Sequence, residues 1–183
     1  GSSTGDYHPL GWTEDLAFMI DWMHTTPQVD GSRIAVLGSS MGAAIAIYVS
    51  AHRDDVAALV TYAGPARITR PANVPESIAR HRHLGIIRDT SFPPSLEAWA
   101  AEFDQLDPLL WISELGPKPL LVMHGSHDDL VTPDNATTLF EQANEPKTLH
   151  LLAGAGHRFR SEPRAMSDAL TWLRSLLILG END

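Results

Sequence analysis

Residues 38–42 read Gly-Ser-Ser-Met-Gly, a G-x-S-x-G motif with Ser40 at its centre. Residues 33–37 before it have the pattern of a short buried strand, and an apolar run long enough for a helix follows. A serine on such a sharp strand-to-helix turn projects its hydroxyl beyond the end of a sheet. We expect both Gly38 and Gly42 to be required, because side chains there would collide where strand and helix cross. Ser40 is therefore a candidate nucleophile.

A second match to the same motif, at residues 1–5, has a different context. No strand pattern precedes it, and Asp6, His8 and Pro9 follow where a helix would have to begin. We predict a loop at this place, so Ser3 is not a candidate nucleophile.

A serine hydroxyl attacks only when a neighbouring base takes its proton and a third group orients that base. Two later segments offer these groups. The strand pattern at 119–123 leads into His-Gly-Ser-His-Asp-Asp at 124–129. The strand pattern at 148–152 leads into Ala-Gly-Ala-Gly-His at 153–157. The order serine, aspartate, histidine, each just past the end of a strand, is typical of one particular scaffold of serine hydrolases.

These segments resemble the α/β-hydrolase superfamily. Residues 29–42 are similar to the segment that carries the nucleophile elbow in its esterase and peptidase-like branches. Residues 124–128 resemble its H-G-x-x-D stretch, and residues 154–157 resemble the loop that presents its catalytic histidine. The resemblance extends from about residue 11 onward, and it is specific for the superfamily and weak for the substrate.

The resemblance implies a role for each candidate. Ser40 is the nucleophile, and His157 is the general base and then the general acid. The family spacing places the acid at Asp128, so Asp129 is predicted to be a solvated loop residue. The resemblance also implies that the backbone N–H of Met41 contributes to the oxyanion hole.

A metal site is the competing interpretation of His124, His127 and Asp128. A lone H-x-x-H on a loop, with no third ligand at a fixed spacing, is more often not metal-binding, so we expect neither a metal nor another cofactor. The other histidines weighed against His157 lie inside strand or helix patterns: His24, His52 and His150.

The elements around these residues predict an α/β fold, with a parallel sheet flanked by helices, because strands and helices alternate. The predicted strands are 34–37, 57–62, 119–123 and 148–152. Predicted helices cover 13–24, the residues after the elbow, the segment from Thr132-Pro133 to about Ala143, and the segment after Ser161 and Pro163, with a short connecting helix from Asp107-Pro108. We expect residues 1–183 to form a single domain.

Residues 66–106 interrupt this alternation, and in the superfamily an insertion here is a cap over the active site. Its apolar residues could roof an acyl pocket or simply hold the cap onto the body of the domain. The candidate substrate-binding residues are Leu84, Phe92, Trp99 and Phe103. Its arginines could recognise an anionic substrate group or belong to a solvated helix face: Arg67, Arg70, Arg80, Arg82 and Arg88.

The superfamily sheet has eight strands in the order 1-2-4-3-5-6-7-8, and this chain is predicted to contain only strands 5 to 8. The strand at 34–37 would then lack its neighbour, strand 3, and expose an apolar edge. The oxyanion hole would also lack the donor from the loop after strand 3. We expect either that an N-terminal half is missing or that two chains associate as a homodimer to cover this edge. The simpler alternative is that a loop or the N-terminal segment of the same chain folds over it.

The composition excludes several classes of partner. Thirteen Lys and Arg against 23 Asp and Glu give a net charge of −10, which argues against nucleic acids and anionic membranes. The chain has no cysteine, so it has no disulfide framework. The uncharged stretch 34–51 is better explained by a strand and a helix than by a membrane span. No signal peptide is visible, and we expect a cytoplasmic location.

Together these patterns predict a serine hydrolase that cleaves a small-molecule carboxylic ester through an acyl-enzyme. A thioesterase or peptidase of the same fold is an alternative, because the same chemistry serves all three bonds. The alternative from another class is a non-catalytic half-hydrolase that binds a ligand without turnover. The missing oxyanion loop favours that alternative, and the intact serine, aspartate and histidine set opposes it.

Overall fold

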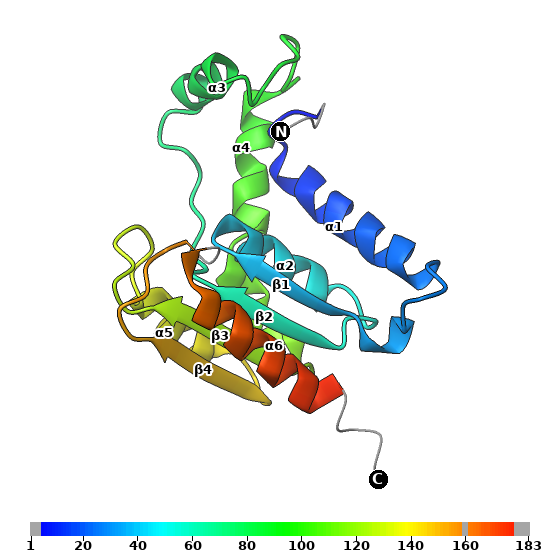
Figure 1. Ribbon diagram of the computed structural model, residues 1–183. Coiled ribbons are helices and arrows are strands. Elements are labelled where there is room, and N and C mark those ends of the chain that lie inside the picture. Colours follow the sequence, from blue (N-terminus) through cyan, green and yellow to red (C-terminus); the bar gives the residue numbers. More distant parts are fainter. Residues whose placement is uncertain (1–4, 159–160, 178–183) are drawn as a thin grey trace.

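The four predicted strands form one parallel sheet in the order β1-β2-β3-β4 (Figure 1). A computed structural model describes residues 5–158 and 161–177, so most of the second motif, residues 1–4, lies outside the described residues. The strands are β1 (Ala35–Ser39), β2 (Ala58–Tyr62), β3 (Leu120–Gly125) and β4 (Lys147–Leu152). The predicted α/β class with a parallel sheet is confirmed.

Helices connect and flank the strands. They are α1 (Pro9–His24), α2 (Met41–Ala51), α3 (Val74–His83), α4 (Leu96–Gln105), α5 (Asp134–Gln142) and α6 (Pro163–Leu177), with short 3-10 helices η1 (Gly31–Arg33), η2 (Pro108–Leu110) and η3 (Ile112–Leu115). The first helix begins at Pro9 rather than at Thr13, because proline is well suited to a first helical turn. Within the described part of the chain, no helix is both long and apolar enough to cross a membrane.

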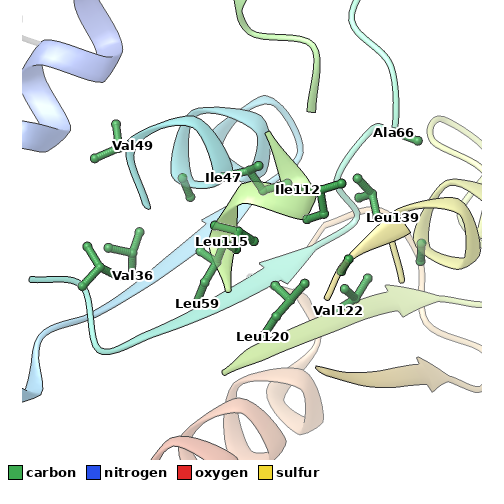
Figure 2. Packing of buried hydrophobic residues seen from close by; sticks show 14 of the residues in the cluster. Val36, Ile47, Val49, Leu59, Ala66, Ile112, Leu115, Leu120, Val122 and Leu139 are labelled. Atoms are coloured by element: carbon green, nitrogen blue, oxygen red, sulfur yellow. The ribbon is translucent and has the colours of Figure 1, made fainter. Parts of the chain in front are cut away.

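Side chains of a strand alternate between the two faces of a sheet, and both faces are covered here. On one face Leu59, Leu120 and Val122 belong to the cluster beneath α2, η3 and α5 (Figure 2). The other face packs against α6 through Val60, Tyr62, Leu121, Met123, Ala165 and Ala169. The two central strands are therefore buried at every position, which explains their continuous apolar sequences.

The outer edge of β1 differs from the rest of the sheet. Among the described residues, no strand pairs with this edge, and the side chain of Leu37 remains 36% exposed. Helix α1 lies over α2 and inserts Ile20 into the main cluster, while Phe18 and Trp22 face solvent. This arrangement agrees with the expectation that the strand lacks a neighbour.

The insertion at 66–106 consists of α3, α4 and their loops, and it packs against the beginning of α2 (Figure 1). Trp99 and Phe103 of α4 share a buried cluster with Ile78 of α3 and with Ala44 of α2. Met41 contacts the same cluster. The insertion is therefore anchored next to the turn that carries Ser40.

The two glycines of the elbow have different surroundings. A Cβ atom added at Gly38 would lie 2.2 Å from the carbonyl oxygen of Gly42. A Cβ atom added at Gly42 would have no atom of the described residues within 4 Å, apart from its chain neighbours and the backbone of its own helix. The predicted steric requirement is confirmed for Gly38 and wrong for Gly42, because a Cβ atom at position 42, in the first turn of α2, would enter open space.

We expect Gly38→Ala to lower the free energy of unfolding by at least about 1–3 kcal/mol, because the methyl group would overlap backbone atoms. Gly42→Ala is the matched control, and it should be neutral or stabilising by up to about 1 kcal/mol, because alanine favours the helix. Denaturant unfolding of both variants measures the difference. Equal losses in the two variants would contradict this account of the elbow.

Candidate active site

Ser40 lies between β1 and α2 with φ 55° and ψ −126°. A positive φ is strained for a residue that has a side chain, and such strain persists only where the surroundings hold it. The Ser40 N–H donates to the carbonyl of Tyr62 at 2.9 Å, which ties the turn to the neighbouring strand. The strained turn lifts the Ser40 hydroxyl out of the sheet edge, as a nucleophile elbow requires.

Met41 is the first residue of α2, and the first N–H groups of a helix have no partner within the helix. The positive end of the helix dipole adds to their attraction for negative charge. The Met41 N–H is thus a suitable oxyanion donor. A second donor, from the loop after strand 3 of the superfamily, has no counterpart among the described residues.

Asp128 follows β3 and is 4% exposed. Its Oδ1 atom accepts the backbone N–H groups of Leu130 at 3.0 Å and of Val131 at 2.9 Å. Burial alone raises the pKa of Asp128, but these N–H groups and the His157 ring outweigh it and hold that pKa below its ordinary value. The buried carboxyl is therefore ionised at neutral pH, whereas Asp129 is exposed.

His157 lies between the other two candidates. Its Nδ1 atom is 2.8 Å from Asp128 Oδ2, and its Nε2 atom is 3.0 Å from Ser40 Oγ. An ionised carboxylate only accepts hydrogen bonds, so Nδ1 carries the proton and Nε2 is free to accept one from the Ser40 hydroxyl. The structure thus brings together the three residues that the sequence singled out, in a geometry suited to activating a serine.

Two residues that no motif indicated hold the loop before His157. The Tyr62 hydroxyl donates to the carbonyl of Gly156 at 2.8 Å, and the Gly156 N–H donates to Glu162 Oε1 at 3.3 Å. Burial, followed by the charges of Glu162 and Asp128, raises the pKa of Tyr62 to about 12. The only sequence signal was the position of Tyr62 at the end of a buried strand.

His124, weighed above as a metal ligand, is buried against Asp128 instead. His127 is exposed on the loop. Within residues 5–158 and 161–177, no group of three or more His, Cys, Asp or Glu side chains is arranged to hold a metal ion.

The four candidate substrate-binding residues have different environments. Trp99 is 1% exposed and Phe103 is 5% exposed, and both pack inside the insertion. Phe92 is partly buried beside them and lines, with Trp99, a cavity of about 360 Å³. Leu84 is 56% exposed. The cluster formed by Trp99 and Phe103 fits the simpler role of holding the insertion onto the body of the domain.

Several arginines of the insertion have structural partners. Arg67 pairs with Asp107 at 2.8 Å, and Arg70 pairs with Asp104. Arg82 donates to the carbonyl oxygens of the loop at Thr90 and Phe92. These contacts favour a structural role over recognition of an anionic substrate.

Comparison with known proteins supports this architecture. Residues 11–178 match the prolyl oligopeptidase family, and the chain belongs to that family. It is 29% identical over 154 residues to the esterase YjfP of Escherichia coli K12, covering 79% of this chain and 57% of that protein. It is also 27% identical over 184 residues to an uncharacterized protein of Mycobacterium tuberculosis, covering 99% of this chain and 59% of that protein. The chain therefore spans less than two thirds of the length of these relatives.

Solved structures show the same fold. The α/β hydrolase GrgF of a Penicillium species superposes with a TM-score of 0.70 at 17% identity, covering 97% of this chain and 75% of that one. The esterase domain of a Rhodothermus marinus protein superposes with a TM-score of 0.66 at 20% identity, covering 96% of this chain and 72% of that one. The predicted membership of the α/β-hydrolase superfamily is confirmed, and these neighbours and the family support a hydrolase.

The raised pKa of Tyr62 has a consequence for stability at alkaline pH. In the unfolded chain a tyrosine ionises near pH 10, whereas Tyr62 in the folded chain ionises near pH 12. The contribution of the neutral Tyr62 hydroxyl to the free energy of unfolding is therefore complete below about pH 10, and it is lost as the pH rises towards 12. We expect Tyr62→Phe to be less stable by about 1 kcal/mol at pH 8, where the hydrogen bond to Gly156 is lost.

This difference should shrink between pH 10 and 12, because only the unchanged protein has the Tyr62 hydroxyl to ionise. Unfolding in urea at several pH values measures it. Tyr48→Phe, on α2, controls for the loss of a tyrosine hydroxyl elsewhere. A difference that stays constant up to pH 12 would contradict the assignment to Tyr62.

Proposed function

We propose that the chain is the catalytic portion of a serine hydrolase that cleaves carboxylic esters through an acyl-enzyme. The observation that carries the proposal is the contact chain from Ser40 Oγ through the His157 ring to Asp128 Oδ2, at 3.0 and 2.8 Å. Each residue follows the end of a different parallel strand, and the serine sits on a strained elbow. A structural role does not require this arrangement.

In the proposed reaction, His157 Nε2 takes the Ser40 proton as Oγ attacks the acyl carbon. The Met41 N–H binds the negative oxygen of the tetrahedral intermediate. His157 then gives the proton to the departing alkoxide, which leaves as the alcohol. A water molecule attacks the acyl-enzyme by the same route and releases the acid and Ser40. Asp128 keeps the imidazole in the required tautomer and stabilises its charged form.

The bond that is cleaved separates the esterase proposal from its nearest alternative. The E. coli relative carries the name esterase, whereas the family is named for peptidases. We favour esters because an ester carbonyl is less stabilised by resonance than an amide carbonyl and is attacked more readily, which matters for a site with one identified oxyanion donor.

The nucleophile is tested by labelling with a fluorophosphonate and by hydrolysis of p-nitrophenyl butyrate. We expect Ser40→Ala to abolish both, because the Ser40 hydroxyl lies 3.0 Å from His157 Nε2, the base of the proposed site. Ser39→Ala, on the neighbouring strand residue, is the matched control and should retain most activity. If Ser40→Ala is still labelled, Ser40 is not the nucleophile. If the protein without substitutions is not labelled, the alternative of a non-catalytic binding module is favoured. A proline p-nitroanilide measures peptidase activity in parallel.

The assignment of the acid to Asp128 is tested by substituting Asp128 and its neighbour Asp129 separately. Asp128→Asn should lower kcat by up to about 10⁴-fold, because the amide disturbs the tautomer of His157 and cannot stabilise its charge. Asp129→Asn changes an exposed residue and should have little effect. Steady-state hydrolysis of p-nitrophenyl butyrate compares the two, and a larger loss in Asp129→Asn would show that the acid has been assigned one residue too early.

A further inference from the structure

His124 is a polar side chain in an otherwise apolar strand. The preceding residues of β3 are Leu120, Leu121, Val122 and Met123, all buried. The His124 side chain is also fully buried, at 0% exposure, directly beside Asp128. A leucine or methionine would suit this position for packing alone, so the imidazole needs another explanation.

The hydrogen bonds of His124 define its orientation and its proton. Its Nε2 atom lies 2.8 Å from the carbonyl oxygen of Val131 and 3.1 Å from Asp128 Oδ2. A carbonyl oxygen only accepts, so Nε2 carries a proton and donates to both oxygens. The opposite ring atom, Nδ1, is buried without a partner among the described residues. The ring therefore donates a hydrogen bond to the loop that carries Asp128, while its own Nδ1 atom stays buried without a partner among the described residues. A buried polar atom without a hydrogen bond costs stability.

The same oxygen, Asp128 Oδ2, receives the ring of His157 at 2.8 Å. The carboxylate thus has a donor on each side: two backbone N–H groups hold Oδ1, and two histidines converge on Oδ2. His124 also closes the loop that carries the acid, since Val131 lies at its far end. Without His124, Oδ2 would be held by His157 alone, the group that the acid must orient.

We propose that His124 is a positioning residue for the reaction: its Nε2–H fixes Asp128 Oδ2 and the end of the acid loop so that the carboxylate stays aimed at His157. This inference rests on the proposed function of Ser40, Asp128 and His157. His124 does not touch substrate, and it acts through Asp128. Its effect falls on the step in which His157 becomes charged, so it changes kcat more than KM.

Two substitutions of similar polarity but different reach test the proposal. In His124→Gln the amide nitrogen lies at about the position of imidazole Nε2 and can donate to the same oxygens, whereas the amide of His124→Asn is too short. We expect His124→Asn to lower kcat for p-nitrophenyl butyrate about 10-fold or more, with KM changed less than about 2-fold. His124→Gln should restore kcat to within about 3-fold of the unchanged protein.

His124→Met and Leu121→Ala separate positioning from packing. His124→Met introduces an apolar side chain of similar volume, and it should lower kcat as His124→Asn does, with little change in Tm. Leu121→Ala opens a cavity in the same strand, where the side chain packs against α6, and should lower Tm without lowering kcat. The proposal is supported if kcat falls in His124→Met but not in Leu121→Ala, and if His124→Gln keeps most of the kcat that His124→Asn loses.

Three outcomes overturn it. The first is equal kcat in the asparagine, glutamine and unchanged proteins, with Ser40 still labelled, which leaves the proposed function intact. The second is a loss of kcat that follows Tm in every variant, including Leu121→Ala. The third is an unchanged protein in which Ser40 is neither labelled nor active, which removes the proposed function and the role of His124 with it.

Discussion

The parallel register of the four strands is the constraint on which the site depends. Ser39 pairs with Tyr62, Tyr62 with Met123, and Met123 with His150, so the strands end along one edge of the sheet. Because all four strands run in the same direction, the turns that follow them meet at this edge. Ser40 and His157 are 117 positions apart in the sequence, yet their reactive atoms lie 3.0 Å apart. The local motifs provide the reactive side chains, and the register of the strands brings these side chains within hydrogen-bonding distance.

The features that cost stability gather at this same edge. Ser40 has a strained backbone, Asp128 carries a buried charge, and His124 leaves a nitrogen unsatisfied. Away from this edge, β2 and β3 are apolar and packed on both faces, and Figure 2 shows the cluster on one of them. A core of this kind holds strained and charged groups in place. The proposed reaction gives a reason for their concentration at one edge, because strained and poorly satisfied groups are expected mainly at functional sites.

The sequence predicted the parts of the site that rest on short-range patterns. The elbow, the strand ends and the order of the candidate residues were all readable, because each depends on a few adjacent residues. Tyr62 and His124 were not assigned their contacts, since their partners come from distant segments and follow no spacing rule. The aromatic residues of the insertion show the same limit. The sequence predicts an apolar environment for Trp99, but it does not show whether Trp99 contacts a substrate or other apolar side chains such as Phe103, which it contacts in the structure.

Packing also links the insertion to the candidate oxyanion donor. Met41 is the residue whose backbone N–H faces the developing charge in the proposed reaction, and its side chain contacts the buried cluster of the insertion. The first turn of α2, which carries this N–H, is thus packed against α4 through Met41 and Ala44. In the superfamily the second donor comes from the loop after strand 3, the strand expected to pair with the outer edge of β1. The two residues of the elbow are therefore held by different parts of the fold. The insertion packs against Met41, the candidate oxyanion donor. The neighbouring strand β2 holds Ser40, the candidate nucleophile, through the Tyr62 carbonyl.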